Sequence, residues 1–113
     1  MPRLDHVAVE SDDPGRAAAF YEQFLGARIV RTEGHPTMAY LRHGAMAIHQ
    51  RGPHGHGNHV GLRVSDEERA ALKRALDEAG IANEERHHGV GVGLFFEDPD
   101  GRQLEAITYE GEA

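Results

Sequence analysis

The sequence contains no cysteine and no tryptophan. The lack of cysteine excludes disulfide bonds, cysteine-type zinc sites, iron–sulfur clusters and a thiol nucleophile. Aromatic residues are few, with three tyrosines and four phenylalanines. This scarcity argues against a broad aromatic groove that stacks a large planar ligand.

Long apolar runs and an excess of positive charge are also missing. No apolar stretch approaches the length of a membrane span, and the segment Met1 to His6 becomes strand-like without an apolar signal region. We therefore expect a cytoplasmic protein that has no membrane partner. The net charge is −7 and no stripe of Lys and Arg is present, so nucleic acid is not an expected partner.

Histidine, in contrast, is abundant. The chain has 113 residues, which suits one domain, and nine of them are histidines spread through the interior of the sequence. Imidazole is the commonest metal ligand in proteins and titrates near neutral pH. The functional question is therefore which of these histidines the fold brings together.

The first half of the sequence reads as one strand, one helix and three strands. Asp13 followed by Pro14 is typical of a helix start, and Gly26 is typical of a helix end. The apolar positions between them recur at helical spacing. The predicted strands are Leu4–Val9, 27–32, 37–42 and 45–50.

The second half repeats this order. Ser65 and Glu68 form a capping box, and Gly80 ends the second predicted helix. The strands predicted around this helix are His59–Val64, 81–86, 92–96 and 103–109. The chain is therefore predicted to be a single α+β domain of two β-α-β-β-β modules, residues 1–51 and 58–113, joined by a Gly/His linker at 52–57.

Strand alternation selects the histidines that share a face. His6 and His59 occupy equivalent positions in the first strand of each module, and His49 and Glu105 are equivalent in the last strand. All four side chains are predicted to point away from the helices. If the modules lie side by side about a local two-fold axis, the four converge. Nitrogen and oxygen donors of this kind suit Fe, Mn, Ni, Co or Zn as a divalent ion.

Glycines precede the strand predicted at 92–96. Gly89, Gly91 and Gly93 alternate with valines, and no helix follows them. They therefore do not form a phosphate-binding loop. We expect these small residues to let another part of the backbone approach closely.

Three segments carry a family resemblance. Leu4–Val9, Ala19–Gly26 and Phe95–Glu105, the last with its Asp98-Pro99-Asp100-Gly101 turn, resemble the vicinal oxygen chelate superfamily of glyoxalases, extradiol dioxygenases, epimerases and bleomycin-resistance proteins. The resemblance implies paired modules that form a cupped mixed sheet with helices on its outer face. It also implies one divalent metal ion held by His6 and Glu105 together with His59.

Relatives of the glyoxalase and epimerase type take a fourth ligand from the position of His49, where they usually have Glu or Gln. Four-ligand and three-ligand sites therefore both remain open. His88 resembles a histidine that extradiol dioxygenases often place before the seventh strand. Tyr109 shares the face of Glu105. These three, Glu105, His88 and Tyr109, are the candidate catalytic residues.

The resemblance implies a metal-dependent enzyme that chelates vicinal oxygens of a small-molecule substrate. Its chemistry would be that of a lyase, an isomerase or a ring-cleaving dioxygenase, and a homodimer is expected. The alternative is a non-catalytic protein of the bleomycin-resistance type that sequesters an antibiotic. Such proteins commonly lack the metal triad, which this chain keeps.

Overall fold

The computed structural model describes residues 1–53 and 57–111. Across these residues it has two helices and eight strands, which follow the order β-α-β-β-β twice. The first set consists of β1 (Arg3–Ser11), α1 (Pro14–Leu25), β2 (Arg28–Val30), β3 (Thr37–Tyr40) and β4 (Ala45–Gln50). The second set consists of β5 (His59–Arg63), α2 (Asp66–Glu78), β6 (Asn83–His88), β7 (Gly91–Glu97) and β8 (Gln103–Tyr109).

The chain divides into two compact units. The first unit is Asp5–His59, and the second unit is Val60–Ala113 together with Met1–Leu4. Residues 54–56, inside the predicted linker 52–57, lie outside the described residues. The predicted α+β class with two β-α-β-β-β repeats is confirmed.

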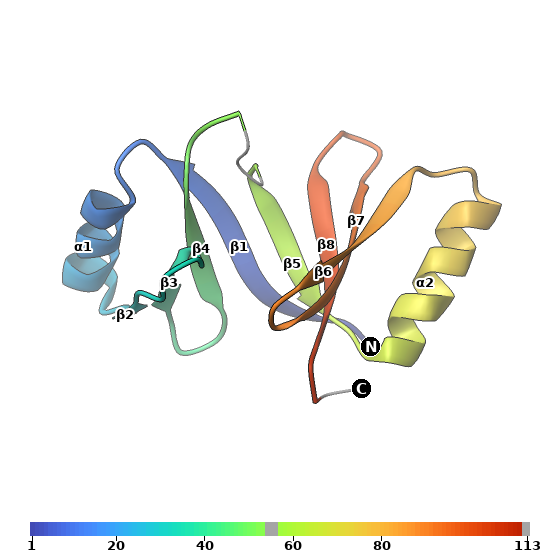
Figure 1. Ribbon diagram of the computed structural model, residues 1–113, viewed down its shortest axis with the longest axis horizontal. Helices are drawn as coiled ribbons and strands as arrows, with labels where there is room; N and C mark the ends of the chain where they lie inside the picture. The colour runs from blue at the N-terminus through green and yellow to red at the C-terminus, as the bar shows by residue number, and fades with distance from the viewer. Residues whose placement is uncertain (54–56, 112–113) are drawn as a thin grey trace. The chain divides into compact units, whose positions relative to one another are not determined.

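The first unit places its strands in the order β2-β3-β4-β1. β1 pairs with β4 in parallel, and the other neighbours are antiparallel. α1 lies against β2, β3 and β4 (Figure 1). Between the helix and the strands lies an apolar core of Ala18, Ala27, Ala39 and Ile48.

The ends of α1 follow the sequence prediction. The side chain of Asp13 accepts a hydrogen bond from the backbone N–H of Arg16 at 3.1 Å, and Pro14 begins the helix. Gly26 has φ of 69°, a left-handed conformation that costs glycine little. The N–H of Gly26 donates to the carbonyl of Glu22 and the N–H of Ala27 donates to that of Tyr21, which ends the helix there.

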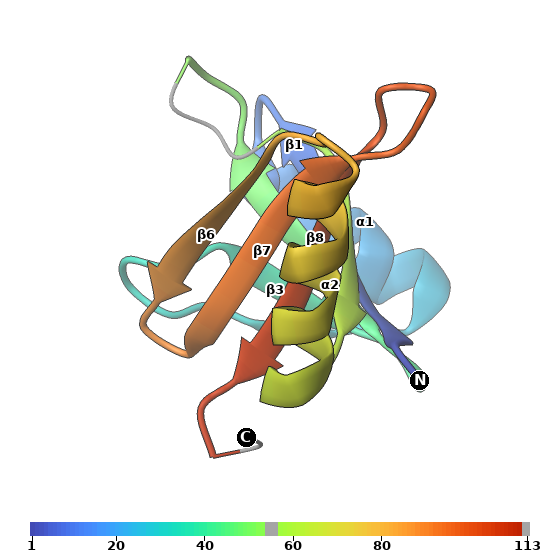
Figure 2. The same ribbon diagram turned by 90° about the vertical axis from the view of Figure 1, so that its right-hand side faces the viewer.

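The second unit repeats this arrangement with the strand order β5-β8-β7-β6. β5 and β8 are parallel, and the remaining pairs are antiparallel. α2 runs along one face of these strands (Figure 2). Its core consists of Val64, Leu76, Leu94 and Ala106. Both hydrogen bonds of the predicted capping box at the start of α2 are present.

Several predicted strands differ from the observed ones by one or two residues at an end, and one is shifted as a whole. The strand expected at 81–86 is β6, Asn83–His88. The N–H of Ile81 bonds to the carbonyl of Leu76 at 2.9 Å, so Ile81 still belongs to the exit from α2. The side chain of Asn83 then donates to the carbonyl of Ile81 at 3.0 Å. As a result the strand starts two residues later and includes His88.

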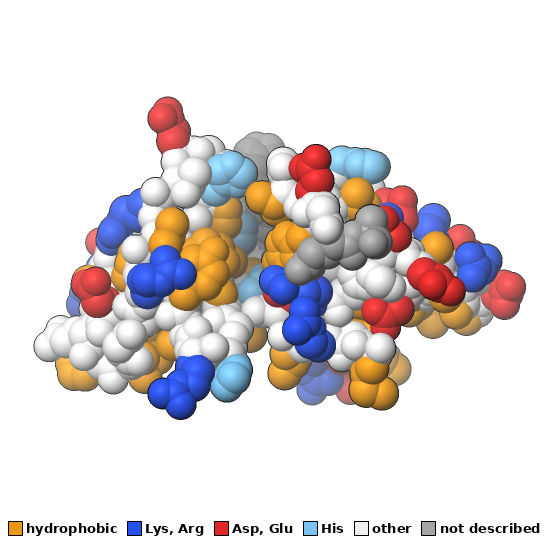
Figure 3. Space-filling view, turned by 90° about the horizontal axis from the view of Figure 1, so that it is seen from below, with side chains coloured by type: hydrophobic (Ala, Val, Ile, Leu, Met, Phe, Trp, Pro, Cys, Tyr) orange, Lys and Arg blue, Asp and Glu red, His pale blue; other side chains and the backbone are white. Residues whose placement is uncertain are grey.

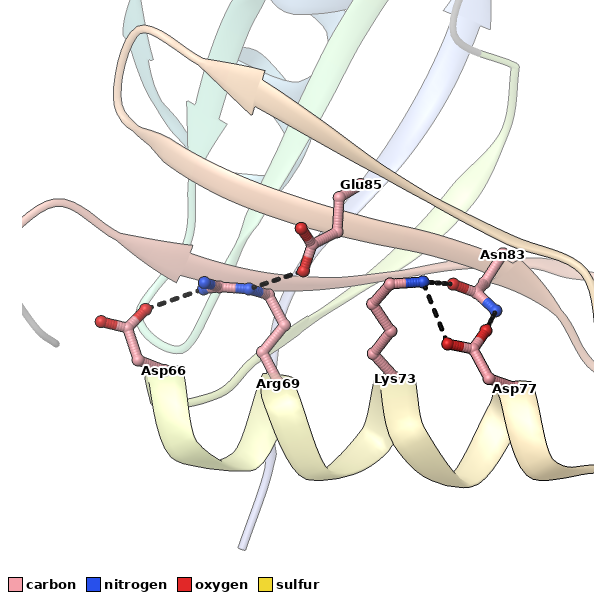
Figure 4. Close-up of polar contacts among 6 residues, drawn as sticks. All are labelled: Asp66, Arg69, Lys73, Asp77, Asn83 and Glu85. Atoms are coloured by element: carbon pink, nitrogen blue, oxygen red, sulfur yellow. Dashed lines mark hydrogen bonds and ion pairs between the residues drawn. The ribbon is translucent and has the colours of Figure 1, made fainter.

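Polar contacts join α2 to the edge strand β6 (Figure 4). Arg69 forms ion pairs with Asp66 at 2.9 Å and with Glu85 at 3.5 Å. Lys73 donates to the Asn83 side chain at 2.9 Å. Charged side chains of both signs gather over α2, at the right of Figure 3. Within the described parts of the chain, no helix is long and apolar enough to cross a membrane.

Candidate metal centre

The candidate site residues occupy the strand faces that point away from the helices. Val9 and Ile48 pack against the core of the first unit, so alternation turns His6 and His49 to the opposite face. Ala106 packs in the core of the second unit, so Glu105 faces the other way. The same alternation applies to His59, His88 and Tyr109.

His6 is oriented by its sequence neighbour. Its Nδ1 donates to Oδ2 of Asp5 at 2.8 Å, and both side chains are nearly buried, with exposed fractions of 11% and 10%. A neutral imidazole that donates from Nδ1 has an electron pair on Nε2. Carboxylates commonly orient metal-ligating histidines in this way. Asp5 therefore prepares Nε2 of His6 as an acceptor or a ligand atom.

His59 meets that prepared nitrogen. The Nε2 atoms of His6 and His59 are 3.1 Å apart, and the two rings are in an edge-to-face arrangement. His59 is the first residue of β5 and is 6% exposed. The first unit thus brings two imidazole nitrogens to one point.

His49 lies near this pair. Its ring centroid is 6.4 Å from that of His59, against 5.2 Å for His6. The ring of His49 is thus the more distant neighbour of His59. This position suits either a further ligand or a residue that supports one.

The second unit supplies a buried carboxylate. Glu105 on β8 is 3% exposed, and its Oε2 accepts a hydrogen bond from Nε2 of His88 on β6 at 2.9 Å. The His88 ring lies edge-on to Phe95, with centroids 6.0 Å apart. Sequence reasoning singled out Glu105 and His88 separately, and the structure pairs them.

Tyr109 ends β8 four positions after Glu105 on the same face. The guanidinium of Arg63 lies over its ring, 4.6 Å from the centroid. This cation–π contact favours the observed orientation of the phenol ring. Tyr109 is half-buried and therefore suits a wall of a binding site.

Sequence reasoning missed one residue of this arrangement and assigned the wrong kind of neighbour to another. Asp5 was missed because strand alternation assigns adjacent residues to opposite faces, although a carboxylate beside a histidine was a usable signal. Gly93 was expected to admit a neighbouring backbone, but the atoms closest to it belong to the Glu105 side chain. The backbone expectation holds for Gly91, where an added Cβ would overlap the carbonyl oxygen of Thr108.

One comparison with known proteins identifies a family. The model of the Glyoxalase/Bleomycin resistance protein/Dioxygenase superfamily matches residues 3–106. No curated protein matches the chain. Solved structures share its fold at low sequence identity.

Methylmalonyl-CoA epimerase from Mycobacterium tuberculosis has a TM-score of 0.77 and 19% identity, over 95% of this chain and 87% of that one. A glyoxalase/bleomycin resistance protein/dioxygenase superfamily member from Vibrio splendidus 12B01 has a TM-score of 0.68 and 16% identity, over 96% of this chain and 99% of that one.

The 2,3-dioxygenase LapB from Pseudomonas sp. KL28 has a TM-score of 0.76 and 20% identity. The match covers 95% of this chain and 40% of the dioxygenase. This chain therefore spans less than half the length of that enzyme.

Proposed function

Because this chain belongs to the Glyoxalase/Bleomycin resistance protein/Dioxygenase superfamily, we propose that it is a metal-dependent enzyme that acts on vicinal oxygens of a small molecule. His6, His59 and Glu105 bind one divalent ion in this proposal. His49 either completes the ligand set or supports it. The reaction is that of a lyase, an isomerase or a ring-cleaving dioxygenase.

The carrying observation is the oriented histidine pair. Asp5 holds His6 so that its Nε2 faces Nε2 of His59 at 3.1 Å. Two imidazoles with nitrogens at one point, one of them oriented by a carboxylate, are typical of metal ligands. The carboxylate of Glu105 is the third donor in this proposal. Two histidines and a carboxylate suit Fe, Mn, Ni, Co or Zn.

A divalent ion bound there would stabilise negative charge that develops on substrate oxygens. The residues of the chain provide the remaining functions. Asp5 keeps the proton of His6 on Nδ1, and Arg63 favours the observed orientation of the Tyr109 ring. Glu105, His88 and Tyr109 are the proposed groups for moving a proton near the substrate, because each can carry one and all three share a sheet face.

The proposal also covers the class of substrate, the oligomeric state and the location of the protein. A small-molecule substrate and a homodimer are proposed from the family resemblance, and a cytoplasmic location is proposed from the sequence. Sedimentation of the purified chain would test the dimer independently of the metal.

The test is the metal content of untagged protein after reconstitution with Fe, Mn, Co, Ni and Zn separately, measured by inductively coupled plasma mass spectrometry. Wild type is compared with His59→Ala and Glu105→Ala. His87→Ala and Glu97→Ala serve as controls, because they remove an exposed histidine and an exposed carboxylate. We expect about one equivalent of metal in wild type and in both controls, and loss of metal in both site variants.

Retention of iron would direct substrate trials to catechols with oxygen uptake as the readout. Retention of nickel, cobalt or zinc would direct them to hemithioacetals and epimerisation. A wild type that takes up none of the five metals would overturn the proposal. The non-catalytic antibiotic-binding alternative would then be tested by bleomycin titration.

A further inference from the structure

We infer that His88 is a positioning residue that holds the carboxylate of Glu105, and that Gly93 is a glycine because the two side chains meet above it. This inference rests on the proposed function in that Glu105 is taken as a ligand. Besides the part in proton transfer proposed above, it assigns to His88 an action through Glu105, and it assigns to Gly93 a role that the proposed function does not contain.

The strand register brings the two side chains to the same place. Gly93 on the central strand β7 pairs with Arg86 on one side and with Ile107 on the other. His88 lies two residues after Arg86, and Glu105 lies two residues before Ile107. Both are therefore diagonal neighbours of Gly93 on the same face, within reach of long side chains.

Gly93 leaves the space that this meeting needs. A Cβ added at Gly93 would overlap Oε2 of Glu105 and would lie 3.0 Å from its Cδ and 3.1 Å from its Cγ. Oε2 is also the atom that accepts the hydrogen bond from His88. Any side chain at position 93 would therefore displace the carboxylate from His88.

Phe95 completes the arrangement. It follows Gly93 on the same face of β7, and its ring lies edge-on to His88. The guanidinium of Arg86 lies over the same ring, 4.6 Å from the centroid. The imidazole of His88 thus has a wall on one side and a hydrogen-bond acceptor at its tip. Both contacts restrict its rotation, and through it the rotation of the carboxylate.

The adjacent histidine provides a matched control. His87 lies on the same strand but on the opposite face, and it is exposed. If only the number of histidines or the stability of β6 mattered, substitutions at His87 and His88 would weaken metal binding equally. If His88 positions Glu105, only the substitution at His88 weakens it.

The first experiment measures Co²⁺ affinity of metal-free protein by absorption against a competing chelator. The variants are His88→Phe, His88→Gln, Gly93→Ala and His87→Phe, with Gly52→Ala as a glycine control that has open space around it. We expect His88→Phe and Gly93→Ala to weaken Co²⁺ binding about 10- to 100-fold. His88→Gln, which retains a donor, should recover part of the loss, and both controls should match wild type.

The second experiment uses metal-free protein alone. Long-range ¹H–¹⁵N spectra of the imidazoles should show His88 with its proton on Nε2 in wild type and Gly52→Ala. That signature should be lost in Gly93→Ala and in Glu105→Ala. Circular dichroism checks that each variant is folded.

The outcomes separate the two proposals. Co²⁺ binding that is equally tight in wild type and in folded His88→Phe would overturn the positioning role and leave the metal site standing. A wild type that binds no Co²⁺ would count against the metal site, and the spectra alone would then decide whether His88 holds Glu105. A wild-type His88 that exchanges between tautomers as it does in Glu105→Ala would overturn the inference in either case.

Discussion

The two units have the same topology but hold their helices by different chemistry. α1 packs through small and apolar side chains, and it leaves Phe20 and Phe24 exposed at 54% and 64%. α2 also has an apolar core, but it adds the Arg69–Glu85 and Lys73–Asn83 contacts to the edge strand β6. The repeat therefore preserves the order and direction of the elements and not the contacts between them.

The edge strands account for this difference. β2 has three residues, and Ile29 at its centre packs against the helix side. β6 has six residues, and the Asn83 and Glu85 side chains meet α2. A polar edge strand that faces a helix needs partners for its side chains, because burying them unpaired is unfavourable. Arg69 and Lys73 supply those partners.

The largest expected effect tests whether the two apolar cores are equivalent. Ile48 is 1% exposed in the first unit and Leu94 is 0% exposed in the second. We expect Ile48→Ala and Leu94→Ala each to reduce the free energy of unfolding by about 2–5 kcal/mol, because each leaves a cavity. Urea titration followed by circular dichroism measures this. A loss below about 1 kcal/mol for only one of them would show that the cores are not equivalent.

The next effect compares the helix caps. Ser65 and Glu68 satisfy two backbone groups reciprocally, whereas Asp13 accepts one helical N–H. We expect Ser65→Ala to reduce the free energy of unfolding by about 1 kcal/mol, within the usual 0.5–2 kcal/mol for a cap, and Asp13→Ala to have a smaller effect. The same urea titration measures both. The reverse order would mean that the cap of α1 matters more than its hydrogen bonds indicate.

A smaller effect concerns the ion pair that distinguishes α2. The Arg69 and Glu85 side chains are 15% and 35% exposed. A double-mutant cycle with Arg69→Ala and Glu85→Ala should give a coupling free energy of about 0.2–1 kcal/mol. The cycle for Arg86 and Glu84, on the same strand, is the control. Zero coupling between Arg69 and Glu85 would remove this pair as a support of α2.

The smallest expected effect is a change in stability at acidic pH. Hydrogen bonds from Asn83 and then Lys73 hold the pKa of Asp77 below its ordinary value of 3.8. A carboxyl whose pKa is lower in the folded state stabilises the protein above the ordinary pKa, and this contribution is lost as pH falls through the lowered pKa. Asp77→Asn should therefore flatten the fall in stability below about pH 4.

Asp98 provides a second test of the same kind. Its pKa is lowered by hydrogen bonds from the backbone and then the side chain of Arg102, with a further one from Asp100. Asp77 and Asp98, the two carboxyls whose pKa values are lowered, both lie in the second unit. As pH falls, the protection of amides from exchange, taken relative to their intrinsic exchange rates, should therefore be lost first around α2 and the 98–102 turn. Earlier loss of protection in α1 would contradict this assignment.

Much of the fold was predictable because its signals are local. Asp13, Gly26 and the Ser65 capping box mark helix ends through bonds within a few residues, and the structure confirms each. The strand at β6 was misplaced because its start depends on the exit of α2. The bond from Ile81 to Leu76 belongs to helix termination, and strand composition does not reveal it.

For the candidate site, the sequence predicted which face of its strand each residue occupies. The period of two along a strand is a property of the backbone, so the sequence alone determined that His6, His59 and Glu105 lie opposite the helix-facing residues. The orientation of His6 by Asp5 depends on a side-chain rotation, which the period does not specify.

The tertiary structure alone decided which side chains meet. His88 and Glu105 are 17 residues apart, and their hydrogen bond requires the register of three strands and an empty position at Gly93. Local patterns determine the elements and the faces because they act through neighbouring residues. Pairing across strands depends on register, and register is set only when the whole unit packs.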